Sequence, residues 1–440
     1  MSRAPERIVH LGVGAFFRAH QAWYTSAVDS ANEWGIVGYT GRSATVADEL
    51  RPQDCKYNLV VRGEAEDRVE LIESLVRIEA GTNVADLIAT VSKPAIALVT
   101  MTITEAGYRV TADFNLDESD PDVVHDLAVL SGAEQGGPKT AMGRLALALE
   151  GRRLAGAAPI AIVPCDNMPN NGRVAKSALV GFARVMSPET LSYFESVVSY
   201  VTTSVDRITP KTTQQDKDFV AENVGWVDNS PVVTEPFHDW VLEGEFPAGR
   251  PAWENAGAKF VANIHPFENR KLWLLNGSHS LLAYAGLLNG AKSVSEAIAQ
   301  PALLVAVNEF WNEACLGLPA DDLDLASYRA DLLARFSNNR IAHNLIQIAT
   351  DGATKLSVRV VPTALAQLKA GKSASGCVFA IASWVRWVIQ TEDIADSKLA
   401  KMKTAKLATN RAQKLIAILS PSLAQNEVFM KQIASQLFFK

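Results

Sequence analysis

The chain has 440 residues, a formal net charge of -6, and 48% hydrophobic and 20% charged residues. This composition is typical of a water-soluble globular protein, and the length is too great for one ordinary core, so we expect two domains. A negative net charge gives no general attraction for phosphate backbones, which argues against a nucleic-acid partner.

No apolar run approaches the length of a membrane span. The longest runs, such as residues 95–101, fall well short of the roughly 20 residues that a spanning helix needs. Residues 1–6 are polar and charged, without the apolar core of a signal peptide. We therefore expect a cytoplasmic protein without a membrane partner.

The cysteines and histidines do not suggest a metal site. The four cysteines form no CxxC pair, which suits a reducing compartment. None of the seven histidines pairs as HxxxH or HExxH, so a zinc-dependent alcohol dehydrogenase would lack its ligands. We expect no catalytic metal.

The N-terminal half alternates strand and helix patterns. Residues 7–12 predict a buried strand that runs into glycine, residues 16–30 a helix, and residues 35–39 a second strand. Further strands are predicted at residues 95–104, 159–164 and 197–204. With helical segments such as residues 142–154, these elements predict a doubly wound α/β sheet.

The composition changes after about residue 255, near Pro251 and Gly257, and the apolar pattern becomes mostly helical. Helical segments are predicted at residues 266–285, 294–315, 328–336, 341–350 and 378–390. We therefore predict an α/β domain over residues 1–255 and a mainly α-helical domain over residues 256–440. The lysine-rich segment 398–414 fits one solvated face of helices.

Gly12-Val13-Gly14 lies between a predicted strand and a predicted helix. Glycine there lets the backbone approach a pyrophosphate at the helix N-terminus. Phe17 takes the place of the third glycine of a GxGxxG motif, and two glycines are also common in structural turns. The position directly after the first strand favours a dinucleotide site.

The end of the second strand does not decide between NAD and NADP. An acidic residue there would bind the adenosine ribose and favour NAD. The strand runs instead into Tyr39 and Thr40, and no acidic residue follows before Asp48. Arg42 offers a partner for the 2'-phosphate of NADP, so both cofactors stay open on these residues.

The segment from His265 to Gly286, HPFENRKLWLLNGSHSLLAYAG, carries the strongest signal for chemistry. Pro266 suits the first helical turn and Gly286 the C-terminal cap. At about 100° per residue, four polar side chains share an arc of about 140° on an otherwise apolar helix: Glu268, Lys271, Asn276 and His279. Leu272 and Leu275 interrupt this arc.

A polar face on so apolar a helix predicts an internal cleft rather than a solvated surface. The flanks KLWLL and SLLAYAG are too apolar for an exposed helix. Burial lowers the pKa of a lysine, which would make Lys271 a usable base near neutral pH. The amide of Asn276 can stabilise an alkoxide that develops on a secondary alcohol.

Two further polar clusters follow predicted strands, where open α/β sheets bind ligands. One is CDNMPNNG, residues 165–172, and the other is VDRITP, residues 205–210. Each alone is more often a loop than a site, and their shared position at strand ends favours a functional role.

Together these motifs resemble the long-chain mannitol dehydrogenase family, which includes fructuronate (mannonate) reductases and arabinitol dehydrogenases. The resemblance runs from residue 8 to about residue 365, and its motifs are HLGVGAFFRAHQAWYT, TMTITEAGY, PCDNMPNNG, VDRITP, TEPFHDWV, KLWLLNGSHS and IATDGATK. It implies a Rossmann-type domain followed by a helical substrate domain. It also implies metal-independent hydride transfer with NAD, with NADP possible, in a monomer or weak homo-oligomer.

The resemblance implies roles for single residues. Lys271 would be the general base, oriented by Asp206. Asn167 and Asn276 would bind the alkoxide oxygen. Gly12, Gly14 and Phe16 would line the cofactor loop, with Arg18 close by. We also predict Arg42 and Val205 as cofactor-binding residues.

Two more residues on the helix of Lys271 take roles from the same resemblance. His279 would hold substrate hydroxyls, and Glu268 would relay protons toward solvent. The chain departs from the family pattern at Phe17, where histidine is common, and at Ser357, where proline is usual.

The substrate depends on Gln347, Lys355 and Arg359, which we predict to bind it. Members that act on polyols tend to have arginine where Gln347 stands, and QIATDGATKLSVR looks more like the fructuronate reductase branch. The guanidinium of Arg359 suits a sugar-acid carboxylate, unless it is an ordinary surface arginine. We therefore favour fructuronate and mannonate, with mannitol and fructose, or arabinitol, as alternatives.

A catalytically inactive nucleotide-binding protein with the same fold is the alternative from another class. It would bind NAD(H) and turn over no polyol or aldonate. The presence of five residues with catalytic roles in the family argues against this alternative: Asn167, Asp206, Lys271, Asn276 and His279.

Overall fold

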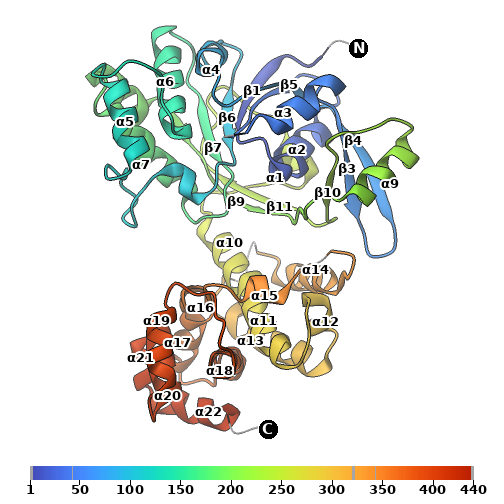
Figure 1. The fold of residues 1–440 in the computed structure, drawn as a ribbon, viewed down its shortest axis with the longest axis vertical. Coiled ribbons are helices and arrows are strands. Elements are labelled where there is room, and N and C mark those ends of the chain that lie inside the picture. The colour runs from blue at the N-terminus through green and yellow to red at the C-terminus, as the bar shows by residue number, and fades with distance from the viewer. Residues whose placement is uncertain (1–2, 42, 320–322, 342, 438–440) are drawn as a thin grey trace. The chain divides into compact units, whose positions relative to one another are not determined.

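The structure, a computed structural model, describes residues 3–41, 43–319, 323–341 and 343–437. The chain divides into two compact units, the N-terminal unit Met1–Ile264 and the C-terminal unit His265–Lys440. The first contains a parallel sheet flanked by helices, and the second is helical (Figure 1). The predicted fold class is confirmed.

A six-stranded parallel sheet forms the centre of the N-terminal unit, in the order β5-β2-β1-β6-β7-β8. The strands are β1 Glu6–Leu11, β2 Gly35–Tyr39, β5 Leu75–Glu79, β6 Leu98–Met101, β7 Ala161–Pro164 and β8 Ser199–Tyr200. The order reverses at β1, which pairs with β2 on one side and β6 on the other. Open sheets of this kind bind ligands at the carboxyl ends of the strands beside the reversal.

Helices cover both faces of this sheet, so its strands are buried on both sides. Ile8 and Val9, neighbours on β1, belong to different hydrophobic clusters because successive strand residues point to opposite faces. The helices of this unit are α1 Ala15–Ala19, α2 Gln21–Val28, α3 Thr45–Leu50, α4 Val84–Val91, α5 Pro121–Leu130, α6 Ala141–Leu154, α7 Asn171–Ala183, α8 Pro188–Ser196 and α9 Gln214–Val224, with short 3-10 turns at Arg51–Gln53, Glu105–Tyr108 and Trp253–Ala256.

Two smaller sheets were not predicted. Their strands are β3 Tyr57–Arg62, β4 Asp67–Ile72 and β10 Val232–Thr234 in one, and β9 Thr202–Asp206, β11 Asp239–Glu243 and β12 Lys259–Phe260 in the other. Three predicted elements of this unit differ from the structure. The strand predicted over residues 95–104 is shorter, since β6 spans only Leu98–Met101. The strand over residues 197–204 is divided between β8 and β9, and the helix over residues 16–30 is interrupted at His20, whose backbone is not helical.

The C-terminal unit has only helices among its described residues, apart from one isolated bridge. They are α10 His265–Arg270, a π-helix Lys271–Gly277, α11 Ser278–Leu288, α12 Val294–Ile298, α13 Pro301–Cys315, α14 Leu325–Ser337, α15 Leu345–Ile348, α16 Gly352–Arg359, α17 Val361–Lys369, α18 Ser375–Gln390, α19 Leu399–Lys406, α20 Arg411–Leu419, α21 Pro421–Gln425 and α22 Glu427–Leu437. Helix α11 packs against α12, α13, α15, α16 and α18, which buries it on all sides.

One helix that we predicted in this unit is divided into two helices in the structure. Residues 294–315 form α12 and α13 because Pro301 cannot continue a helix and begins a new one at its first turn. The solvated face predicted for the lysine-rich segment is confirmed, since Lys401, Lys403 and Lys414 are exposed. Among the described residues, no helix combines the length and apolarity of a membrane span.

Candidate active site

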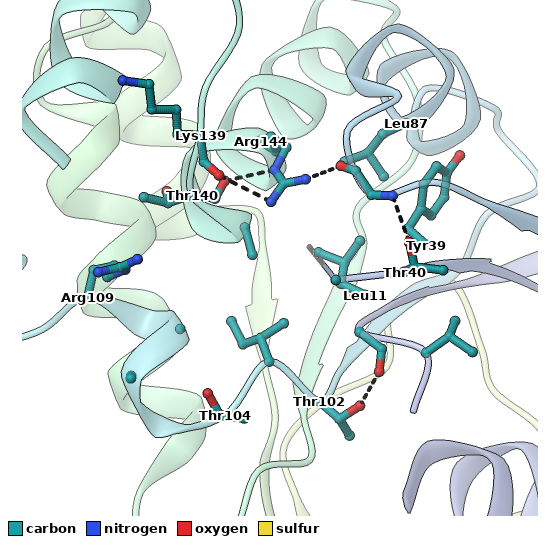
Figure 2. A pocket seen from close by; sticks show the side chains of 18 of the residues that line it. Leu11, Tyr39, Thr40, Leu87, Thr102, Thr104, Arg109, Lys139, Thr140 and Arg144 are labelled. Atoms are coloured by element: carbon teal, nitrogen blue, oxygen red, sulfur yellow. Dashed lines mark hydrogen bonds between the residues drawn. The ribbon is translucent and has the colours of Figure 1, made fainter. Parts of the chain in front are cut away.

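A cavity of about 720 Å³ opens at the carboxyl ends of β1, β2 and β6 in the N-terminal unit (Figure 2). Residues that follow each of these strands line it, together with residues of α4 and the start of α6. They include Gly12, Tyr39, Gly41, Thr102, Thr104 and Arg144. The cavity therefore occupies the crevice in which such sheets bind nucleotides.

Gly12 shapes the first turn of this cavity. Its φ is 96°, a left-handed conformation that favours glycine. A Cβ at this position would overlap the carbonyl oxygen of Thr102. Around Gly14, by contrast, a Cβ would meet only the carbonyl oxygen of Gly12, at 3.8 Å. The turn thus leaves backbone exposed to the cavity, as a pyrophosphate cradle requires.

The buried His10 supports the glycine turn. His10 Nδ1 lies 2.8 Å from the Thr100 hydroxyl, and Nε2 lies 3.1 Å from the Thr102 hydroxyl, which donates to the Gly12 carbonyl. Burial lowers the pKa of His10 to about 3, so the ring is neutral. The ring of Phe17 stacks on it at 3.5 Å. Position 17 therefore packs into the core, which explains why no third glycine is needed there.

Four residues of the predicted cofactor set do not line the cavity: Gly14, Phe16, Arg18 and Val205. Arg18 is buried, and its Nη1 donates to the carbonyl and hydroxyl of Ser230, while Nε donates to the Gly14 carbonyl at 3.3 Å. Through these hydrogen bonds Arg18 stabilises the glycine turn. Arg42 lies outside the described residues.

Asp166 holds the loop that follows β6 in place. The sequence motif did not identify Asp166 and pointed instead to its neighbour Asn167. The Asp166 carboxylate accepts from the backbone NH of Ile103 at 3.1 Å, the backbone NH of Thr104 at 2.7 Å and the hydroxyl of Tyr108 at 2.7 Å. Thr104 has a φ of 67°, which is strained for a β-branched residue. Burial raises the pKa of Asp166, against the effect of these hydrogen bonds.

Basic side chains gather beside α6, at the far end of the cavity from the glycine turn. Arg144 donates to the carbonyls of Gly81, Thr140 and Lys139 (Figure 2). Arg109 pairs with Asp120 at 2.6 Å and with Asp122 at 3.3 Å. Asp122 is the one carboxylate residue in the described lining, and none comes from the end of β2.

The structure brings together the two predicted polar clusters of the N-terminal unit. Asn167 is exposed directly after β7, and Asp206 ends β9. Between them, the amide of Asn171 donates to the carbonyls of Asp166 at 3.1 Å and Thr203 at 2.9 Å. The loop after β7 is therefore fastened to β9 and carries Asn167 with it.

In the C-terminal unit, the helix of Lys271 is not a regular α-helix. α10 leads into the π-helix Lys271–Gly277, which leads into α11 without a break in helical backbone. Hydrogen bonds in a π-helix join residues five apart, and Lys271 and Asn276 are five apart. The predicted separation of about 140° on an α-helix is therefore wrong, and π geometry stacks the two positions on one face. Such segments occur frequently at functional sites.

His279 lies one turn further, buried on α11. Its ring is 5.1 Å from that of Phe336 and 4.8 Å from that of His343. Burial, followed by nearby positive charges, holds the pKa of His279 well below its ordinary value, so the ring is neutral. Its Nε2 has no hydrogen-bond partner in the part of the chain described. On α10, the carboxylate of Glu268 lies 3.0 Å from Nδ1 of the exposed His265.

Helix α16 carries two of the three predicted substrate residues. Lys355 Nζ donates to the Ile348 carbonyl at 3.1 Å and the Thr350 hydroxyl at 3.3 Å. Arg359 Nη1 reaches the helix of Lys271, where it donates to the carbonyl of Asn276 at 3.3 Å. Gln347 is exposed on α15.

Both units match family models. Residues 6–255 match the mannitol dehydrogenase Rossmann domain, and residues 263–438 match the mannitol dehydrogenase C-terminal domain. The chain belongs to the mannitol dehydrogenase family. The resemblance found in the sequence motifs is thereby confirmed.

Similar proteins agree with this assignment. The chain is 33% identical to D-mannonate oxidoreductase of Escherichia coli, over 99% of this chain and 93% of that one. It is 35% identical to mannitol 2-dehydrogenase of Cereibacter sphaeroides, over 88% of this chain and 81% of that one. A ternary complex of Pseudomonas fluorescens mannitol 2-dehydrogenase with NAD and D-mannitol matches with a TM-score of 0.79 and 31% identity, covering 99% and 91% of the chains. This mannitol dehydrogenase family member is an oxidoreductase that acts on CH–OH groups, as predicted.

Proposed function

We propose that this enzyme interconverts a keto-sugar acid with its aldonate, D-fructuronate with D-mannonate in the first place, using NAD. The observation that carries the chemistry is the half-buried π-helix, whose geometry brings Lys271 and Asn276 onto one face. A base and an amide donor on the same face suit the oxidation of a secondary alcohol.

The residues around the N-terminal cavity fit a dinucleotide. Gly12 leaves no room for a side chain between β1 and the loop after β6, and the cavity of about 720 Å³ follows the strand ends on both sides of it. NAD bound there would supply the acceptor for the hydride of the carbinol carbon. Asp166 and His10 hold the cavity wall in shape.

In the proposed oxidation, Lys271 Nζ accepts the proton of the substrate hydroxyl. The amide of Asn276 donates to the oxygen as its negative charge develops. The family resemblance gives Asn167 the same role and Asp206 that of orienting the lysine. Glu268 then passes the proton toward solvent. His279, held neutral by burial, holds a substrate hydroxyl. The reverse reaction returns the proton and hydride to the ketone.

The test is a spectrophotometric screen of mannonate, fructuronate, mannitol and arabinitol with NAD(H) and NADP(H). We expect the highest kcat/KM with mannonate or fructuronate and NAD(H). Preference for mannitol or arabinitol would replace the sugar-acid proposal with the polyol alternative. NADH binding by calorimetry without turnover of any substrate would support a catalytically inactive nucleotide-binding protein.

A further inference from the structure

The π-helix Lys271–Gly277 changes the spacing of the helical hydrogen bonds. An NH in a π-helix bonds to the carbonyl five residues back, whereas an NH in an α-helix bonds four residues back. Where the chain returns from the first spacing to the second, one carbonyl is skipped and has no NH of its own helix to accept from. A buried carbonyl in that position needs a donor from elsewhere in the molecule.

The carbonyl of the buried Leu274 lies at this change of spacing. In an α-helix it would accept from the NH of Ser278, four residues later. The NH of Ser278 donates instead to the Leu275 carbonyl. The Leu274 carbonyl accepts from the indole Nε1 of Trp311, on α13, at 2.9 Å. A side chain of another helix therefore supplies a donor that α-helical spacing would have supplied from within.

Helix α13 packs closely against the same end of the π-helix. The side chain of Trp311 is fully buried. Beside it on α13, the ring of Phe310 lies so near Gly277 that a Cβ on this glycine would come within 2.6 Å of the ring. Gly277 is the last residue of the π-helix, three residues after Leu274. Two neighbouring aromatic residues of α13 therefore contact the π-helix where its spacing changes.

Burial of the tryptophan does not by itself explain the indole hydrogen bond. Trp240 is also fully buried, and its Nε1 has no hydrogen-bond partner in the part of the chain that the structure describes. The indole of the buried Trp253 donates to a side chain, the hydroxyl of Thr25. Trp311 differs from both, because its partner is the carbonyl of a helix at the residue where the spacing changes.

The spacing decides how Lys271 and Asn276 face each other. On an α-helix, residues five apart are separated by about 140° around the axis, at about 100° per residue. On the π-helix, the two positions are stacked on one face. A change to α-helical spacing would turn one of these side chains away from the other.

We propose that Trp311 is a positioning residue for the reaction. Its indole NH holds the Leu274 carbonyl in the π-helical arrangement, and this keeps Lys271 and Asn276 on one face. The effect on catalysis rests on the proposed function, in which Lys271 is the base and the Asn276 amide binds the developing alkoxide. Trp311 acts through the backbone of the π-helix and contacts no reacting atom.

The first experiment is structural and does not depend on turnover. Trp311→Phe removes the indole NH and keeps an aromatic ring in its place. In a crystal structure of the full-length variant, we expect the Leu274 carbonyl to accept from the Ser278 NH, with Lys271 turned away from Asn276. A variant that keeps π-helical hydrogen bonds over residues 271–277 would overturn the proposal.

The second experiment measures kcat with D-mannonate and D-mannitol, and the dissociation constant of NADH. One hydrogen bond shifts an equilibrium about 3- to 10-fold, so Trp311→Phe should lower kcat by about that factor. NADH affinity should stay within about twofold, since the glycine turn lies in the other unit. In an Asn276→Ala background, the same substitution should lower kcat less than about twofold. Equal factors in both backgrounds would show a general structural role and overturn the proposal.

Trp253→Phe is the matched control. Trp253 is as buried as Trp311 and also makes one indole hydrogen bond, to Thr25 at 3.1 Å, but in the N-terminal unit. The control should lower the melting temperature about as much as Trp311→Phe and keep kcat within about twofold of the wild type. If Trp311→Phe does not fold, Trp311→Met replaces it in both experiments, because methionine also lacks the NH and fills irregular space.

The outcomes separate this proposal from the proposed function. Full activity in Lys271→Ala or Asn276→Ala would overturn the proposed function, and the crystal structures would still show whether Trp311 holds the π-helix. An unchanged π-helix in Trp311→Phe, together with a large loss of kcat in Lys271→Ala, would overturn the positioning role alone. A change of spacing, with a loss of kcat only where Asn276 is present, supports both proposals.

Discussion

The two units differ in whether the side chains at their candidate sites have hydrogen-bond or ion-pair partners. In the N-terminal unit two arginines at the cavity have partners: Arg109 pairs with Asp120, and Arg144 is bonded to three carbonyls. In the C-terminal unit, Arg359 has no acid and the Nε2 of His279 has no partner within the described residues. The first unit offers a cavity shaped by backbone, while the second offers side chains that still need a partner. Unsatisfied groups are where a ligand is expected.

The largest effect should come from the catalytic side chain of the C-terminal unit. Lys271→Ala should reduce kcat about 100- to 10,000-fold, because a general base contributes about that much. NADH affinity should stay within about twofold. Steady-state kinetics and calorimetry would measure both values, with Lys292→Ala, an exposed lysine of the same unit, as control. Full activity in Lys271→Ala would refute the proposed base.

Gly12→Ala tests whether backbone shape decides binding in the N-terminal unit. The left-handed φ and the overlap with Thr102 should weaken NADH binding more than tenfold and reduce the free energy of unfolding by about 1–3 kcal/mol. Gly137→Ala is the control, since its φ is not positive and a Cβ there would meet only Val84, at 3.8 Å. Fluorescence titration with NADH and urea unfolding measure the two effects, and equal binding by both variants would contradict the argument.

Asp166→Asn should have a smaller effect on the same cavity. The amide replaces an acceptor by a donor that faces the NH groups of Ile103 and Thr104. We expect KM for NAD to rise several-fold to about tenfold, with a smaller change in kcat. Asp113→Asn, at an exposed turn of the same unit, is the control. A change in stability with KM for NAD unaltered would show that Asp166 only supports the fold.

The smallest effect concerns the pH dependence of stability. Burial lowers the pKa of His238 to about 4, below the ordinary value of 6.5. An unfolded chain then binds more protons than the native one, so stability is full above pH 6.5 and falls as pH decreases toward 4. His238→Gln should lose about 1–2 kcal/mol less than the wild type between pH 7 and pH 4.5. Urea unfolding at the two pH values measures the free energies of unfolding. An equal loss in the variant and the wild type would refute the prediction.

Local patterns predicted much of the N-terminal unit. The strands at residues 7–12, 35–39 and 159–164 were found near their expected bounds, because strands buried on both faces form short apolar runs. The glycine turn could be located because a left-handed residue between a strand and a helix leaves a mark in the sequence. The family could be named because its motifs are contiguous.

Only the tertiary structure decided the parts that depend on distant pairing. β3 pairs with β10 across most of the N-terminal unit, and such short strands carry no pattern that names their partner. The change from α- to π-helix at Lys271 could not be predicted, since the residue types are compatible with either. That Arg359 reaches Asn276 depends on Gly277 and Gly352, which let α16 approach the helix of Lys271. Periodicity along a chain records which faces are buried, but not what they are buried against.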